Sequence, residues 1–182
     1  MDMQIKIFAI GLCVSLTFSC CSTVLVDSED AGKSKQFKKK LIESFETAER
    51  IDLVEHSCAL DYFSVPGIDL DNAPTAEYKR VTLTREQQEQ FSKAFRAMSD
   101  APKDMFSGCI FEPHHSIEFH FPDGSKSVIE ICFKCGDTIW QGTSGLLEPK
   151  KFQSTFAALM TPLGFQRERD WKALAKDHVG QE

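Results

Sequence analysis

The sequence predicts an α+β domain, in which an antiparallel sheet of about four to five strands carries helices mainly on one face. Three segments have apolar residues at helical spacing, and the segments between them alternate apolar and polar residues as strands do. Two strand segments are joined by Pro122-Asp123-Gly124, a sequence typical of a tight turn. Helices separated by runs of hairpin-linked strands favour the α+β class.

Each of the three predicted helices places a row of large apolar residues on one face. The helices cover residues 33–50, 84–99 and 147–163, with rows formed by Phe37, Leu41, Ile42 and Phe45; by Phe91, Phe95 and Met98; and by Phe152, Phe156, Leu159 and Met160. Thr84 can cap the second helix, because Gln87 follows three residues later and completes a capping box. The polar stretch after Phe165 either adds a short helix at 170–176 or frays.

The strand segments lie mostly in the middle of the chain. They are residues 51–55, 78–83, 116–121, 127–133 and 137–140, and a further short strand is considered at 62–65, inside a loop that spans 58–77. Ile117, Phe119 and Phe121 alternate with polar residues, so this row is expected to face the core.

The composition is that of one ordinary globular domain. The chain has 182 residues, 42% hydrophobic and 26% charged, with 15 phenylalanines for a core. A net charge of −6 offers no basic face of the size that nucleic-acid binding needs, so no nucleic acid is expected as a partner. One basic run is interpreted as a solvated helix face or as a surface close to an anionic membrane. This run consists of Lys33, Lys35, Lys38, Lys39 and Lys40.

Residues 1–20 are predicted to be a lipoprotein-type signal peptide. The apolar run 7–19 is shorter than the roughly 20 residues that span a bilayer, but it fits the apolar region of a signal peptide. Ser19 is a small residue directly before Cys20, as lipidation at Cys20 requires, although Thr17 stands where such signals usually have leucine. The alternatives are lipidation at Cys21, secretion with cleavage nearby, and an uncleaved buried N-terminal segment.

The expected organisation is therefore a signal at 1–20, a tether at 21–32 and a single domain at 33–182. The domain is expected to be exported to the periplasm or cell surface. Its expected partner is the membrane, reached through the N-terminal lipid anchor. Without a lipid, the protein would be secreted in soluble form.

A cluster of cysteines and histidines lies around the predicted hairpin. It comprises Cys109, His114, His115, Cys132 and Cys135. Cys132 and Cys135 would point to opposite faces of a regular strand, so they can act together only in a tight turn, for which Gly136 gives the freedom. A three-residue hairpin loop places His114 opposite Cys132, whereas a two-residue loop places His115 there. Three thiolates and one imidazole are a common tetrahedral zinc set, so the sequence predicts a zinc site.

Other readings of the cluster stay open. Outside the cytoplasm, Cys109 could form a disulfide with Cys132 or Cys135; the Cys-x-x-Cys pair could be redox-active; or the thiols could be inert. Glu112 and Glu130 could serve as the base of a catalytic zinc, but four protein ligands would close the site, which favours a structural ion. His56 and Cys58 form a second pair that is too weak to predict a site.

Residues 109–117 (CIFEPHHSI) and 131–135 (ICFKC) resemble a family of small, mostly exported bacterial proteins of unknown function. Its members carry a cysteine, then Pro-x-His, then a Cys-Phe-x-Cys strand end. The resemblance covers about residues 45–165, but its specific part is only about 27 residues. It implies that the cluster belongs together and that His115 is the histidine of Pro-x-His. The family often has arginine where His114 stands here.

The functional expectation is a lipid-anchored envelope protein of unknown activity, with a structural zinc held by Cys109, His115, Cys132 and Cys135. The alternatives are a disulfide-stabilised binding domain without metal, and a metal- or thiol-dependent enzyme. No catalytic residue is predicted, because the chain carries no Ser-His-Asp signature, phosphate-binding loop or dinucleotide fingerprint.

Overall fold

The computed structural model describes residues 28–104 and 108–180, and it confirms the α+β class. Its helices are α1 (Ser28–Thr47), α2 (Arg85–Ala97), α3 (Phe152–Met160) and α4 (Trp171–Val179), with short 3-10 helices η1 (Ala59–Tyr62), η2 (Leu70–Asn72) and η3 (Thr161–Leu163). Its strands are β1 (Arg50–His56), β2 (Glu77–Thr82), β3 (His115–His120), β4 (Lys126–Cys132) and β5 (Asp137–Trp140). None of the helices in this part of the chain is long and apolar enough to cross a membrane.

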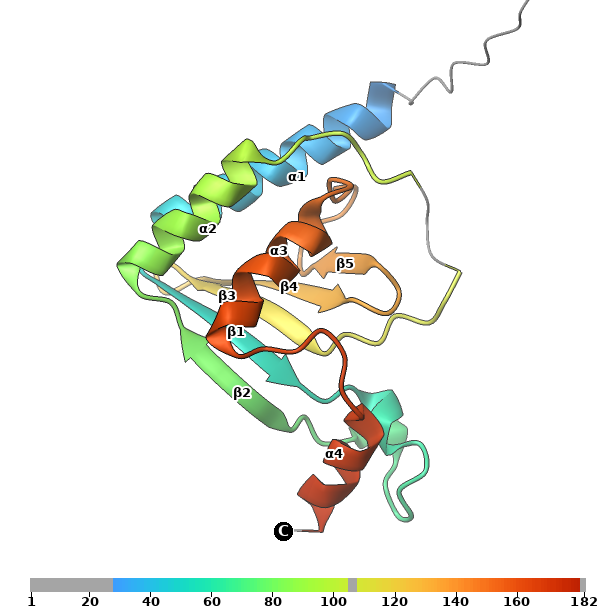
Figure 1. Ribbon diagram of the computed structural model, residues 1–182. Coiled ribbons are helices and arrows are strands. Elements are labelled where there is room, and N and C mark those ends of the chain that lie inside the picture. Colours follow the sequence, from blue (N-terminus) through green and yellow to red (C-terminus); the bar gives the residue numbers. More distant parts are fainter. Residues whose placement is uncertain (1–27, 105–107, 181–182) are drawn as a thin grey trace, which may run out of the picture.

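The five strands form one antiparallel sheet in the order β2-β1-β3-β4-β5. The helices α1, α2 and α3 cover one face of this sheet, and α4 lies beside η1 at one end of it (Figure 1). The odd-numbered residues of the central strands, such as Leu53, Ile117 and Ile129, are buried under the helices. The sheet thus has one apolar face, as the alternation of its residues predicts.

Phenylalanine rings form the layer between the helices and the sheet. Phe45 of α1 contacts Phe95 of α2 and Phe119 of β3, with ring centroids 5.4 and 5.1 Å apart. Phe152 of α3 stacks on Phe95 at 5.7 Å and meets Phe37 of α1 edge-on. Every helix that covers the sheet therefore contributes rings to the same core, and the helical spacing of these residues is what brings them there.

Local signals in the sequence account for the ends of several elements. The capping box of α2 is present: Gln87 N–H donates to the Thr84 hydroxyl (3.3 Å), and Thr84 N–H donates to the Gln87 side chain (2.8 Å). The β3–β4 turn closes with Phe121 N–H donating to the Ser125 carbonyl (3.0 Å), and Gly124 takes a φ of +81° that favours glycine. Of the two loop lengths considered, the three-residue loop is therefore the observed one.

Three elements differ from the expectation. The first helix begins at Ser28, so residues 28–32 of the expected tether are helical; Glu29 and Asp30 stand in its first turn, where negative charge stabilises a helix. The third helix begins at Phe152 rather than 147, because Pro149 and Lys150 are held against the segment at residues 101–102. The strand considered at 62–65 is instead the end of η1 and a turn.

Replacing Phe95 with alanine is expected to lower the free energy of unfolding by about 3–5 kcal/mol, because its ring is fully buried among other rings. Phe63→Ala is the matched control, since the Phe63 side chain is 74% exposed and its loss should change stability by less than about 0.5 kcal/mol. Urea denaturation measures both. Equal effects of the two substitutions would contradict the described core.

Candidate metal centre

The end of the sheet at which β1 runs into η1 gathers most of the cysteine and histidine side chains. β1 ends there, β3 begins there and the turn from β4 to β5 closes there, while α4 lies beside η1 (Figure 1). The β3–β4 register pairs His115 with Ile131, and its continuation by one residue places His114 opposite Cys132. This is the register that the three-residue loop predicts.

The Cys132–Cys135 segment forms the expected tight turn. Gly136 has a φ of +68°, and the amide N–H of Cys135 donates to the Cys132 Sγ at 3.2 Å. The Cys135 thiol donates to the carbonyl oxygen of Ile110, at 2.7 Å. Both cysteines are buried. The amide donor therefore fixes the Cys132 sulfur beside Cys135.

Cys109 joins this pair from the chain segment that precedes β3. Burial, and then hydrogen bonds with the thiols of Cys109 and Cys132, raise the pKa of Cys135 to about 12. We refer to Cys109, Cys132 and Cys135 as the thiol cluster, in which Cys135 interacts with both of the other thiols. Among the described residues, this set is not one whose ligand atoms all lie within 4.8 Å of one another. Cys109 is its exposed member, and all three are free thiols in the structure.

His115 lies on the helix-covered face of the sheet. Its Nε2–H donates to the Gln166 carbonyl at 2.8 Å, and its ring meets Phe133 and Trp171 edge-on. Burial lowers the pKa of His115 to about 3, so the imidazole is neutral. Its described contacts account for one ring nitrogen only. Coordination of a metal by His115 together with the thiol cluster stays a prediction.

His114, the neighbouring histidine, belongs to a different group of potential ligands. Its Nε2 lies 3.0 and 3.1 Å from the two carboxylate oxygens of Asp61, and its ring stacks on Trp171 with centroids 4.3 Å apart. Cys58 precedes η1, and its amide N–H donates to Asp61 at 2.8 Å. The ligand atoms of Cys58, Asp61 and His114 all lie within 4.8 Å of one another, so this group could hold a metal ion.

Sequence reasoning missed the group of Cys58, Asp61 and His114. The sequence offers Cys58 only a weak pairing with His56, and no motif includes Asp61. The signal that could have revealed this group is the spacing of Cys58 and Asp61, because the single turn of η1 brings these two side chains to the same side. Their approach to His114 depends on the pairing of β1 with β3, which a loop sequence alone does not reveal.

A second group that could hold a metal lies on the uncovered face of the sheet and comprises Asp52, Glu118 and His120. Arg80 already forms ion pairs with Asp52 (3.0 Å) and with Glu118 (2.8 Å). Lys126 forms a further ion pair with Glu118 at 2.9 Å. These cations supply the positive charge that a metal would bring, so we interpret this group as an ion-pair network of the sheet surface.

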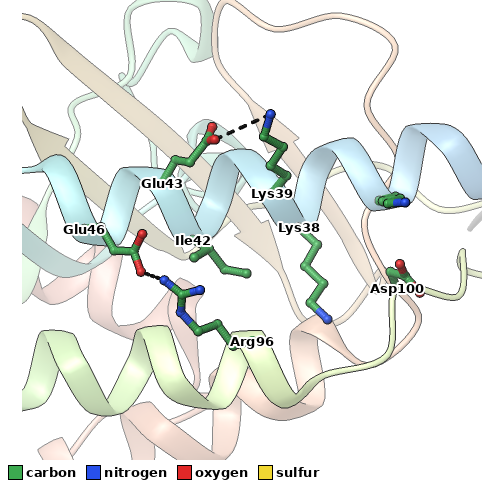
Figure 2. A pocket seen from close by; sticks show the side chains of 8 residues that line it. Lys38, Lys39, Ile42, Glu43, Glu46, Arg96 and Asp100 are labelled. Atoms are coloured by element: carbon green, nitrogen blue, oxygen red, sulfur yellow. Dashed lines mark ion pairs between the residues drawn. The ribbon is translucent and has the colours of Figure 1, made fainter.

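The groove between α1 and α2 has a volume of about 400 Å³ and is lined largely by charged side chains (Figure 2). Several of those charges are paired within the protein: Arg96 with Glu46, and Lys39 with Glu43. Lys38 donates to the carbonyl of Met98, at the end of α2. These contacts favour the interpretation of the basic run as part of a helix face over its interpretation as a membrane-binding surface.

Comparison of the chain with protein-family models, with curated proteins and with solved structures finds no match. The resemblance carried by residues 109–117 and 131–135 therefore stays a hypothesis. The predicted signal peptide, Cys20, Cys21 and residues 22–27 of the expected tether lie outside the described residues.

The low pKa of His115 predicts a specific loss of stability in acid. The ordinary pKa is 6.5, and the folded value is about 3, so below pH 6.5 the unfolded chain takes up a proton that the folded chain does not. Through this group, the free energy of unfolding is expected to fall by about 2 kcal/mol between pH 6.5 and about pH 5, at roughly 1.36 kcal/mol per pH unit. Urea denaturation of the wild type and of His115→Gln at both pH values isolates the pH-dependent contribution of His115, which the variant should lack. A His115 ring signal that titrates near pH 6.5 in nuclear magnetic resonance would contradict the assignment.

Proposed function

We propose that the protein is an exported, lipid-anchored domain of the cell envelope that binds zinc at the thiol cluster. The observation that carries the proposal is the Cys132–Cys135 turn, in which the Cys135 amide donates to the Cys132 Sγ and the Cys135 thiol interacts with Cys109. A Cys-x-x-Cys-Gly turn of this shape presents two sulfurs to one ion, and a third sulfur completes most of a tetrahedral set.

The chemistry of three adjacent thiols favours a bound cation. Burial, and then the neighbouring thiols of Cys109 and Cys132, make ionisation of Cys135 costly, and this cost appears as its raised pKa. A divalent ion removes this cost, because it compensates the thiolate charges and lets the thiol protons leave to solvent. Sulfur ligands select zinc over hard ions such as calcium and magnesium.

His115 is the fourth ligand that we propose, on the basis of the family resemblance. It is neutral, as a ligand imidazole must be, and its Nε2–H already donates to a backbone carbonyl. Histidines that bind zinc commonly use one nitrogen for the metal and give the other N–H to such a carbonyl. The Nδ1 atom would then face the ion. A closed set of four protein ligands makes this zinc structural and not catalytic.

The envelope location rests on the N-terminal segment. The apolar run 7–19 and the Ser19–Cys20 pair support export followed by lipidation at Cys20. Because α1 begins at Ser28, residues 21–27 would connect the lipid to the domain. The ligand or protein partner of the domain is not proposed, since no feature of the site selects one.

Lipidation is tested by separating membranes from soluble fractions. Cys20→Ser is expected to release the protein from the membrane fraction, because it removes the atom that carries the lipid. Cys21→Ser is the matched control and should leave the protein in membranes. Retention of both variants in the membrane fraction would contradict the lipid anchor. Release of the Cys21→Ser variant alone would show that Cys21 carries the lipid.

The zinc site is tested by elemental analysis, thiol titration and thermal melting of the purified protein. Cys132→Ser and Cys135→Ser are each expected to lower the melting temperature by on the order of 10 °C, because a structural zinc contributes folding energy directly. The control is the same pair of variants after removal of metal with a chelator, when their difference from the chelated wild type should largely disappear. Metal-free protein with a disulfide from Cys109 would contradict the proposal and support the disulfide alternative.

A further inference from the structure

We infer that Cys58, Asp61 and His114 form a second metal site, which takes a divalent ion of the zinc type and keeps one coordination position open. This inference goes beyond the structural zinc proposed for the thiol cluster, and it uses none of the same ligands. The three ligand atoms lie within 4.8 Å of one another, and no residue of the thiol cluster belongs to that group.

The site is assembled by tertiary structure before any ion binds. The Asp61 carboxylate is held by the amide of Cys58, and the His114 ring is fixed by the indole of Trp171, which lies parallel to it at an angle of 5°. Asp61 and His114 are both buried, and Cys58 is half-buried. Ligands that are fixed in this way lose little conformational freedom when they close on an ion.

The donor set matches the ion in both type and charge. Thiolate, imidazole and carboxylate are the three ligand types that zinc combines in proteins. On binding, the Cys58 Sγ–H bond breaks and its proton leaves to solvent. The hydrogen bond between His114 and Asp61 also breaks, and its hydrogen moves to the ring nitrogen that does not bind the ion, so that a carboxylate and a neutral imidazole become ligands. The two negative charges of Cys58 and Asp61 balance the two positive charges of the ion. A neutral assembly is the kind that a buried position tolerates best.

Nucleophilic catalysis by Cys58 agrees less well with the surroundings of its thiol. Burial, and then the negative charge of Asp61, raise the pKa of Cys58 to about 11, so the free protein holds a thiol there and not the reactive thiolate. A bound cation reverses this balance, because it favours the thiolate at neutral pH. The negative charge of Asp61 would therefore hinder Cys58 as a nucleophile, but it would help Cys58 to bind a cation.

Access to the ion would come through a neighbouring cavity. The cavity has a volume of about 350 Å³, and Cys58 lines it together with His56, Phe111 and Glu130, among others. Three protein ligands leave one position of a tetrahedral ion for water or another small donor. Since one of the three ligands forms part of the cavity wall, a small donor molecule can reach the ion from the cavity.

Cobalt titration of the reduced, metal-free protein tests this inference, because Co²⁺ reports sulfur ligands and tetrahedral geometry through its absorption bands. The wild type is expected to bind two ions. Cys58→Ser should bind one at wild-type affinity and the other at least ~100-fold more weakly. Serine is also a good helix-capping residue, so the metal-free variant should melt like the metal-free wild type. Cys58→Ala serves as a second variant if Cys58→Ser does not fold.

His56→Gln is the matched control, because His56 lines the same cavity but is not in the ligand group. It should keep both ions. Imidazole, added as a small donor, should shift the cobalt bands of the wild type and of His56→Gln, but not those of Cys58→Ser. A wild type that binds one ion, lost in Cys58→Ser, would support this site while contradicting the zinc at the thiol cluster. Unchanged stoichiometry and affinity in Cys58→Ser would overturn the inference.

Discussion

The register between β3 and β4 is the constraint on which both the core and the ligand groups depend. The three-residue turn at 122–124 pairs Phe119 with Ser127, and every later pair follows from it. A slip of one residue would turn Ile117 and Phe119 away from the helices and bring polar residues into the phenylalanine layer. The packing of that layer therefore also fixes the positions of His115, the first residue of β3, and of His114 directly before it.

The alternation of side chains along β3 gives two adjacent histidines different surroundings. His115 points with Ile117 and Phe119 toward the helices, where burial keeps it neutral. His114 meets the carboxylate of Asp61 in η1 instead. Trp171 contacts both rings, stacked on one and edge-on to the other. The first residue of α4 therefore holds both histidines in place, so α4 supports the site although it lies outside the main core.

Patterns that act over a few residues were readable from the sequence. The capping box at Thr84, the turn at 122–124 and the tight turn after Cys132 each depend on neighbours within four residues, and each is present. The group around Asp61 could not be read in this way, because Asp61 and His114 are more than fifty residues apart and meet only through the β1–β3 pairing. The start of α3 was misplaced for the same reason: contacts with the segment at residues 101–102 hold Pro149 and Lys150 outside the helix.

The two proposed sites would respond differently to an oxidising compartment. In the thiol cluster, Cys135 interacts with two further thiols, and the exposed member, Cys109, is open to oxidants, so disulfide formation competes there with metal binding. Cys58 is the only sulfur in its group, and its other ligands are oxygen and nitrogen, which do not form disulfides. Oxidation would therefore convert the thiol cluster into a disulfide while the group of Cys58, Asp61 and His114 kept its ligands. Outside the cytoplasm, the site with fewer sulfurs is the one whose metal binding depends less on redox conditions.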